Sequence, residues 1–555
     1  MAHDSSSRDL RWAAWGLGAL TLVLRLVFET HRLFDHDSVQ FALGVERFDL
    51  AAHHPHPPGY PVYIGLVRRL VTFGLEPAEA MVWLSVLASA LGTVAMVYLA
   101  ARLARTGREA RHDDDSARWA GITAGLLFAV HPHLWYYGEL PLLYGLEGGL
   151  APIVALAVLR MSGSGSAQVL ATVLFGLVAG LRQSTAVFLA PLFLFGLVQS
   201  WRAGRLSLLR FAGLASAGGF VVACWALPLL MNAGGLAAYR ALSGDHFGTL
   251  LPQTSILYGA GVSALAHNLE VLTKWTLQGL VPALPLVGFL LISRAGRESW
   301  LERLGPRIGV LLLWLLPPVL FFALFHVTKA GYTLIYQPAL LVAVALAAAP
   351  ALASEARYRA AVLGLVVAVG AGLFVFGRER APESPKLLSL VRHEFNAGSL
   401  RRFEKDLDEL LGALAKLPPE RAVLVALELA GTGGAGAQGF LYPWHRHLQW
   451  YLPAHQTVLL APDAGFALTT RGHGPFVDAG REIPVPWGTE RLVFVAAAPP
   501  GERFPLPLGE VLVANRTFYV VSCPLPADRR VGAFRFREIP LEFKGVPGAV
   551  RAPTG

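Results

Sequence analysis

Long apolar runs constrain this sequence more than any other feature. A helix needs about 20 mostly apolar residues to cross a bilayer. About eleven runs approach or reach that length, at 12–28, 80–101, 119–137, 142–159, 167–182, 184–200, 211–231, 273–293, 308–325, 333–352 and 360–376. Only 15% of the residues are charged, whereas an ordinary soluble domain has about 25%. The sequence therefore predicts a polytopic α-helical membrane protein.

The stretch 167–200 leaves the number of spans open. Its two apolar halves meet at the short sequence GLRQS without a proper loop. One long tilted helix, a re-entrant pair or two complete spans would each fit such a run. We favour two spans, because only then do the later arginine-rich loops all fall on one side of the membrane.

The net charge of +9 comes from arginines that concentrate in the short loops between apolar runs. Such loops stay on the cytoplasmic side, so the charge predicts topology and does not indicate a nucleic-acid partner. The loop arginines are Arg102, Arg105, Arg108, Arg111 and Arg118, then Arg160, then Arg202, Arg205 and Arg210, then Arg294, Arg297, Arg303 and Arg307, and finally Arg357 and Arg359. The first run lacks a cleavage site and is expected to remain as a span. We expect a bacterial inner-membrane protein with a cytoplasmic N-terminus.

The composition changes after the last apolar run. We therefore divide the chain into a membrane bundle, 1–377, whose outer loop 29–79 carries interfacial helices, and an extracytoplasmic α/β or α+β domain, 378–555. The stretch 388–417 has the pattern of an amphipathic helix. AVLVAL and RLVFVAA are typical of strands, and WHRHLQWYLPAHQTVLL of a helix followed by a strand. The glycine-rich stretch 431–439 lacks the spacing of a nucleotide loop and predicts a connection.

The first outer loop holds the first candidate for chemistry. Asp35 and Asp37 follow the end of the first span closely, and a carboxylate at that interface can be tuned as a base. Further along, His56 precedes Pro57-Pro58-Gly59-Tyr60-Pro61, a rigid turn. Each feature alone also fits a structural role, because aspartates cap helices and such prolines turn the chain.

Together these residues resemble a known superfamily. Asp37-Ser38 after the first helix and the HPPGYP turn at 56–61 are similar to one branch of the GT-C glycosyltransferases, which use polyprenyl-phosphate sugars as donors. Protein O-mannosyltransferases and aminoarabinose transferases belong to that superfamily. The resemblance implies that Asp37 is the catalytic base or orients the acceptor, with Asp35 in reserve. The branch usually has a second acid soon after Asp-Ser, but here the next one is Glu46.

A second acid stands at the outer end of the third predicted span. A charged carboxylate at the edge of the membrane has a free-energy cost, so Glu139 at this position indicates a functional role. We expect it to be the partner of Asp37. The arrangement of Trp135, Glu139 and Tyr144 also resembles the second outer motif of the same branch. The aromatic residues around Glu139, taken alone, indicate only an interfacial belt.

Transfer from a lipid-linked sugar also needs cations, because the leaving phosphate gains negative charge. Arg182 and Lys329 are the outer-side candidates. The segment around Lys329 resembles the late outer loop of the superfamily, with Tyr332 in a following position. His56 and Tyr60 complete the set of expected donor-binding residues. The alternative for Lys329 is a lysine that snorkels to the interface.

Cofactors are not clearly indicated. His53, His54 and His56 with Asp37 could bind zinc or manganese, but the histidines lack helical spacing and no second cluster completes a site. A divalent metal is possible and not favoured. The two cysteines exclude a disulfide framework or a cysteine metal site.

These observations predict an inverting glycosyltransferase. On the outer face of the membrane, Asp37 would activate an acceptor hydroxyl on a protein, lipid or glycan, and this hydroxyl would attack a sugar held on polyprenyl phosphate. A multi-pass transporter is one alternative, although it would normally show internal repeats and charges deep in its spans. A non-catalytic envelope assembly protein is the other. Both alternatives predict that Asp37→Asn leaves the function intact.

Overall fold

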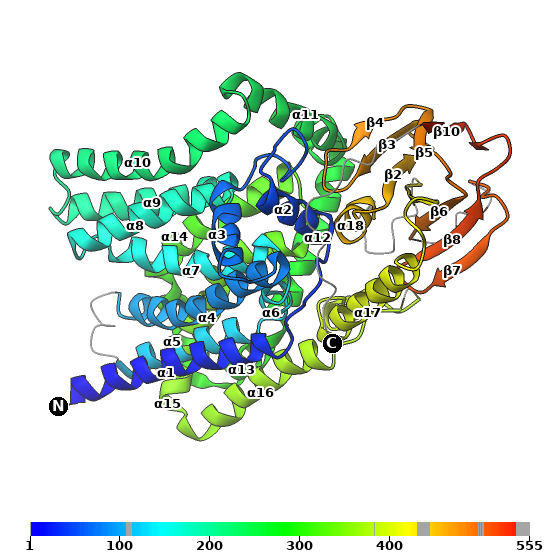
Figure 1. Ribbon diagram of the computed structural model, residues 1–555. Helices are drawn as coiled ribbons and strands as arrows, with labels where there is room; N and C mark the ends of the chain where they lie inside the picture. The colour runs from blue at the N-terminus through cyan, green and yellow to red at the C-terminus, as the bar shows by residue number, and fades with distance from the viewer. Residues whose placement is uncertain are drawn as a thin grey trace. The chain divides into compact units, whose positions relative to one another are not determined.

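The computed structural model describes residues 2–106, 114–381, 383–429, 444–497, 499, 501 and 504–539 (Figure 1). The chain forms two compact units. The first contains Met1–Arg32 and Pro57–Leu400, and the second contains Leu33–His56 and Arg401–Gly555.

The first unit is helical. Its long helices are α1 (Ala2–Leu26), α4 (Pro77–Ala104), α5 (Asp114–Ala129), α7 (Leu143–Arg160), α8 (Gly165–Leu181), α9 (Gln183–Arg202), α10 (Leu208–Asn232), α11 (Leu236–Thr254), α12 (Gly261–Leu280), α14 (Arg294–Leu324), α15 (Gln337–Ser354) and α16 (Ala356–Val375). The shorter ones are α3 (Pro61–Val71), α6 (Pro132–Gly138), η2 (Ile256–Tyr258), η3 (Val281–Ala283), α13 (Leu284–Ile292), η4 (Ala330–Ile335) and η5 (Lys386–Leu390). Among the described residues, eight helical segments are long and apolar enough to cross a membrane. The expected polytopic helical membrane protein is confirmed, but these eight candidate spans are fewer than the roughly eleven predicted from the apolar runs.

The stretch 167–200 forms two helices, as predicted. α8 ends at Leu181, α9 begins at Gln183, and Arg182 alone separates them. The far ends of the two helices meet, because the Arg205 guanidinium donates a hydrogen bond to the Gly163 carbonyl (2.8 Å). The pair is therefore a helical hairpin with Arg182 at its turn.

The predicted span 119–137 is wrong in extent. Its helix, α5, stops at Ala129, and α6 begins at Pro132. Proline has no backbone N–H and clashes with the preceding turn, so an α-helix cannot run through it undisturbed. The His131 side chain instead caps the new helix by accepting a hydrogen bond from the Leu134 N–H (3.2 Å).

Close backbone approach holds the centre of the bundle together. α4 packs against both α5 and α7. At the α4–α7 crossing, a Cβ added to Gly149 would lie 2.4 Å from the Ala88 carbonyl oxygen, a distance that no side chain tolerates. Small residues allow helices in a membrane to pack at such short range. Glycine at position 149 is thus required by packing.

The second unit is built on two sheets. Its strands are β1 (Ala422–Leu427), β2 (Gln456–Ala461), β3 (Phe466–Arg471), β4 (Val477–Asp478), β5 (Glu482–Pro486), β6 (Arg491–Ala496), β7 (Glu510–Ala514), β8 (Tyr519–Pro524), β9 (Arg530–Val531) and β10 (Phe534–Ile539). Among the described residues, the larger sheet has the order β4-β3-β2-β1-β6-β8-β7, and β5-β10-β9 form the smaller one. β1 pairs in parallel with both β2 and β6, and all six β1 residues are buried. The expected domain of mixed helices and strands is confirmed.

Helices cover one face of the larger sheet, and the smaller sheet covers the other. α17 (Ala397–Leu414) and α18 (His445–Tyr451) lie on the helical side. α17 buries Leu407, Leu410 and Leu414 fully, as its amphipathic pattern predicts. The helix starts later than expected, because Asn396 accepts a hydrogen bond from the Ser399 N–H (3.0 Å) in the manner of an N-cap. The glycine-rich stretch 431–439 lies outside the described residues.

Residues 33–56 belong to the second unit, although the sequence division assigned them to the bundle. Their helix, α2 (His36–Glu46), packs against α18. The Tyr451 hydroxyl accepts a hydrogen bond from the Leu33 N–H (2.8 Å), and Glu46 pairs with His473 at 2.6 Å. These contacts join residues more than 400 positions apart, which a local sequence pattern does not reveal.

Candidate active site

The first unit places a buried ion pair at the turn of the α8–α9 hairpin. The Arg182 guanidinium lies 3.4 Å from the Glu147 carboxylate of α7, with 16% and 7% of the two side chains exposed. The Thr185 hydroxyl also donates a hydrogen bond to Glu147. Arg182 and Thr185, which are three residues apart, thus both contact the Glu147 carboxylate. The ion pair fixes the direction of the Arg182 guanidinium.

Two tyrosine rings contact Arg182, and one of them also contacts a second cation, Lys329. The Arg182 guanidinium carbon lies 4.6 Å from the ring centre of Tyr332 and 5.8 Å from that of Tyr144. The Lys329 ammonium lies 5.8 Å from the ring centre of Tyr144. The faces of aromatic rings attract cations. The structure therefore gathers three residues predicted from the sequence, Arg182, Lys329 and Tyr332, around Tyr144.

Tyr60 of the HPPGYP turn lies close enough to Arg182 for an electrostatic interaction. The residue is buried and has a positive φ of 50°, a conformation that bulky residues rarely adopt. The neighbouring Pro58 carbonyl accepts hydrogen bonds from Gln183 and from Tyr239, both at 3.3 Å. Because Gln183 follows Arg182 directly, the turn is tied to the hairpin that carries the arginine.

Glu139 has a different environment. Both of its carboxylate oxygens are buried and lack a hydrogen-bond partner among the described residues, while its backbone carbonyl accepts a hydrogen bond from the Thr30 hydroxyl (2.6 Å). Burial raises the pKa of the Glu139 carboxyl well above its usual range, although the charge of Arg25 opposes this. No interaction joins it to Arg182 or Lys329 in the described part of the chain. Its expected pairing with Asp37 concerns residues of different units and stays a prediction.

The interfacial aromatic belt expected around Glu139 is wrong. Trp135, Tyr136, Tyr137 and Tyr144 are all buried. Trp135 stacks on Phe374 with ring centres 4.5 Å apart. These aromatic side chains form part of the interior of the first unit, where Tyr144 serves as the ring that both cations contact.

The second unit holds the two aspartates of the first outer loop, and they differ in role. Asp35 is the N-cap of α2 and forms a capping box with Ser38, in which each side chain accepts a hydrogen bond from the other residue's backbone N–H (both 3.0 Å). Asp37 lies in the first turn of α2, and 24% of its side chain is exposed. Helix capping thus accounts for Asp35, whereas Asp37 presents a carboxylate toward another polar side chain.

That side chain belongs to His56. Its Nδ1 lies 4.0 Å from the Asp37 carboxylate and 2.5 Å from the Gln40 side-chain oxygen. Gln40 also contacts the ring nitrogen of His36 at 2.9 Å. The imidazole of His56 is therefore oriented between an amide and a carboxylate, and it belongs to the second unit, whereas Tyr60 of the same motif belongs to the first.

The three neighbouring histidines do not gather as metal ligands would. His54 contacts the buried Arg446 guanidinium (3.1 Å), and burial together with that charge lowers the pKa of His54 to about 3. His53 adopts a positive φ of 58° in the intervening turn. Within the described residues, no group of three or more histidines, cysteines or carboxylates is arranged to hold a metal ion.

Comparison with known proteins gives this geometry a context. Residues 49–204 match the family model described as the protein O-mannosyl-transferase TMEM260 N-terminal domain. The structure is similar to the crystal structure of ArnT from Cupriavidus metallidurans bound to undecaprenyl phosphate, with a TM-score of 0.50 and 14% identity over 91% of this chain and 97% of that chain. The chain therefore has an ArnT-like fold. Its similarity to apo ArnT from the same organism covers the same shares, with a TM-score of 0.46 and 15% identity. No curated protein matches the sequence.

The family match covers part of the candidate site. Arg182, Glu147 and Tyr144 lie within residues 49–204, whereas Asp37 and Lys329 lie outside them. Sequence reasoning missed Glu147, although a carboxylate inside an apolar run is a signal of function. It also missed Gln40, for which the sequence offers no signal, because the contact with His56 depends on how the loop folds.

Proposed function

We propose that this protein is a glycosyltransferase that moves a sugar from a polyprenyl-phosphate donor to an acceptor hydroxyl. The observation that carries the proposal is the gathering of Arg182 and Lys329 around Tyr144. Two cations held at one buried aromatic ring favour a ligand with an anionic headgroup, and preorganised positive charge stabilises a departing phosphate. The undecaprenyl phosphate bound to the similar ArnT, and the O-mannosyl transfer named in the matched family model, support this choice of donor.

In the proposed reaction, the acceptor oxygen attacks the anomeric carbon and forms the new glycosidic bond with inversion. The bond between that carbon and the phosphate oxygen breaks, and its electron pair leaves with polyprenyl phosphate. Asp37 takes the proton of the acceptor hydroxyl, while His56, 4.0 Å away, orients its carboxylate. Arg182 and Lys329 stabilise the charge that grows on the leaving phosphate, and Tyr60 and Tyr332 position the donor. No nucleotide takes part.

The two aspartates of the first outer loop provide a matched test. Purified protein in liposomes is given polyprenyl-phosphate mannose, and then other polyprenyl-phosphate sugars, and the release of polyprenyl phosphate is measured. General bases contribute about 10²–10⁴-fold to rates, so Asp37→Asn should lose at least about 100-fold. Asp35→Asn should keep its rate within about threefold, because asparagine caps helices as well as aspartate does.

Two results would overturn the proposal. One is equal turnover by the wild type and the Asp37→Asn variant. The other is the absence of turnover with every donor in a folded wild-type sample, combined with sugar transport into vesicles. The second result would favour the transporter hypothesis instead.

The proposed side of catalysis rests on topology. We place the N-terminus in the cytoplasm and residues 378–555 in the periplasm, because this topology puts the arginine-rich loops on the cytoplasmic side of the membrane. Single cysteines are introduced near Arg205 and near Asp478, each in a protein that lacks Cys224 and Cys523. The cysteine near Arg205 should react with an impermeant thiol reagent only from the cytoplasmic side. The cysteine near Asp478 should react only from the periplasmic side. Labelling of both from one side would contradict the assignment.

A further inference from the structure

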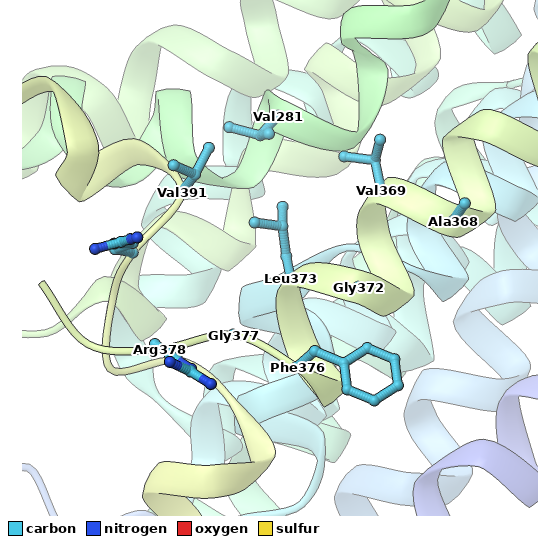
Figure 2. A pocket seen from close by; sticks show the side chains of 10 residues that line it. Val281, Ala368, Val369, Gly372, Leu373, Phe376, Gly377, Arg378 and Val391 are labelled. Carbon is cyan, nitrogen blue, oxygen red and sulfur yellow. The ribbon is translucent and has the colours of Figure 1, made fainter.

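A pocket of about 490 Å³ lies in the first unit, along the last turns of α16 (Figure 2). Its walls are mainly apolar and include Val281 of η3, Val369 and Leu373 of α16, and Val391 after η5. The Leu373 side chain points from α16 toward Val281 and Val391 (Figure 2). None of the predicted donor-binding residues lines this pocket.

One end of the pocket is positively charged. Arg378 and Arg392 line it, and the side chain of each is exposed. Neither arginine forms an ion pair or a side-chain hydrogen bond with another residue in the described part of the chain. The nearby carboxylates of Glu379 and Glu394 are absent from the lining, and Glu379 accepts a hydrogen bond from the Ser399 hydroxyl (3.0 Å).

The wall opposite α16 is held in place by several hydrogen bonds. The Gln278 side chain of α12 donates to the Ser389 carbonyl of η5 (2.7 Å). The Arg392 N–H donates to the Leu388 carbonyl (2.7 Å), and the Asn396 side chain donates to the His393 carbonyl (2.6 Å). The backbone that carries Val391 and Arg392 is therefore anchored to α12, so the pocket is a built feature of the fold.

The position of the pocket relates it to a bilayer. α16 is a candidate membrane span, and the pocket covers its C-terminal end and the residues directly after it. The end of a span lies where the hydrocarbon core meets the headgroups. An apolar pocket that ends in two arginines at this depth matches the two parts of a lipid, since the chains need an apolar wall and a phosphate pairs with guanidinium groups.

We propose that this pocket binds one anionic glycerophospholipid, with its phosphate between Arg378 and Arg392 and the first part of an acyl chain against Leu373 and Val281. The site is separate from the residues assigned to the transfer reaction and does not depend on them. An anionic lipid held there would join η5 to the end of α16.

Gly372 allows a sharp test. It lines the pocket, and a Cβ added to it meets no atom within 4 Å, so Gly372→Leu fills the pocket without a clash at the backbone. Gly364→Leu is the matched control, because Gly364 lies on the same helix with equally open space and outside the pocket. Arg378→Gln/Arg392→Gln removes the charges, and Arg357→Gln at the other end of α16 is its control.

Each protein is titrated with dioleoyl phosphatidylglycerol or dioleoyl phosphatidylcholine, and bound lipid is counted by native mass spectrometry. Unfolding temperatures verify that the variants are folded. We expect the wild type to retain one phosphatidylglycerol and no phosphatidylcholine. Each basic residue near an anionic lipid contributes about a fivefold preference, so the double arginine variant should lose about 30-fold in affinity. Gly372→Leu should also lose the lipid, and both controls should keep it.

Three outcomes would overturn the proposal. The first is equal retention of the two lipids, which removes the anionic headgroup from the recognition. The second is retention of phosphatidylglycerol by Gly372→Leu at the wild-type level. The third is displacement of phosphatidylglycerol from the wild type by an equal concentration of undecaprenyl phosphate, which would give the pocket a different occupant.

Discussion

Arg182 and Glu147 form an ion pair across 3.4 Å between the turn of the α8–α9 hairpin and the first half of α7. The pair connects helices that are neighbours in the bundle but not continuous with each other. Because Arg182 also contacts Tyr332 and Tyr144, the direction set by Glu147 decides where the guanidinium points.

The first prediction concerns Glu147. Glu147→Ala should lower the free energy of unfolding by about 3 kcal/mol, because removing one partner of a buried pair leaves the other charge uncompensated. Glu147→Gln keeps an acceptor for the Thr185 hydroxyl and should cost less. Chemical unfolding in detergent measures both variants, with Glu355→Ala as a control from a partly exposed position. A Glu147→Ala protein as stable as the wild type would mean that the pair contributes nothing.

The second prediction concerns Lys329. Lys329→Gln should lower kcat for a polyprenyl-phosphate sugar about 100-fold, since groups that stabilise charge in a transition state typically contribute this much. Lys329→Arg, which keeps the charge, should retain most of the rate. Single-turnover measurements separate this effect from donor binding. The exposed Lys386→Gln variant is the control, and an equal loss in both lysine variants would remove Lys329 from the proposed clamp.

The third prediction is a pH dependence within the second unit. Partial burial alone would lower the pKa of His473, but its hydrogen bond to Glu46 and the charge of that carboxylate raise it. A raised pKa in the folded state stabilises the protein below pH 6.5, and the stabilisation is lost as the pH rises through the higher value. His473→Gln should therefore lower the unfolding temperature at pH 6 and have little effect at pH 9.

Glu46→Gln serves as the control for this dependence. It should produce the same pH profile as His473→Gln, and the double variant should add little to either single change. Profiles that are flat with pH would show that the pair does not contribute to stability through protonation.

The fourth prediction concerns Arg307, one of the arginines expected in a cytoplasmic loop. Its buried side chain donates hydrogen bonds to the carbonyls of Leu103 (2.6 Å), Ala104 (2.9 Å) and Thr106 (2.6 Å) at the end of α4. A cation at a helix C-terminus is favourable, and charged hydrogen bonds are strong. Arg307→Ala should lower the free energy of unfolding by about 2–4 kcal/mol, while Arg357→Ala should change it little. Equal stability of the two variants would contradict this role.

The helices were predictable because each apolar run needs a helix to satisfy its backbone in a membrane. The division of 167–200 into two helices followed from charge alone. The end of α5 was not predicted, although Pro132 marked it, because the run of apolar residues continues past the proline. The second unit was predicted as a mixture of helices and strands. Its inclusion of residues 33–56 depends on long-range packing, such as the contact of His54 with Arg446.

The candidate site was predictable by residue type and less so by arrangement. Few basic residues are predicted on the outer side of the membrane, so the sequence indicated Arg182 and Lys329. In the structure, both cations lie near the ring of Tyr144. The role of Tyr144 as a shared ring has no sequence signal, because aromatic residues at the end of a span are common. The spacing of Asp35 and Ser38 fits a reciprocal helix cap, which separates Asp35 from Asp37 once the start of α2 is known.

The second unit combines two segments that lie far apart in the sequence, and this has a consequence for biogenesis. Residues 33–56 leave the ribosome long before their partners, since Arg446 follows His54 by 392 residues. At about 5–20 residues per second, that separation lasts roughly 20–80 s. During this time the α2 segment, with its buried apolar side chains, has no sheet or α18 to pack against. The membrane helices must therefore insert while this early segment is still without its packing partners. The second unit assembles only when translation nears its end.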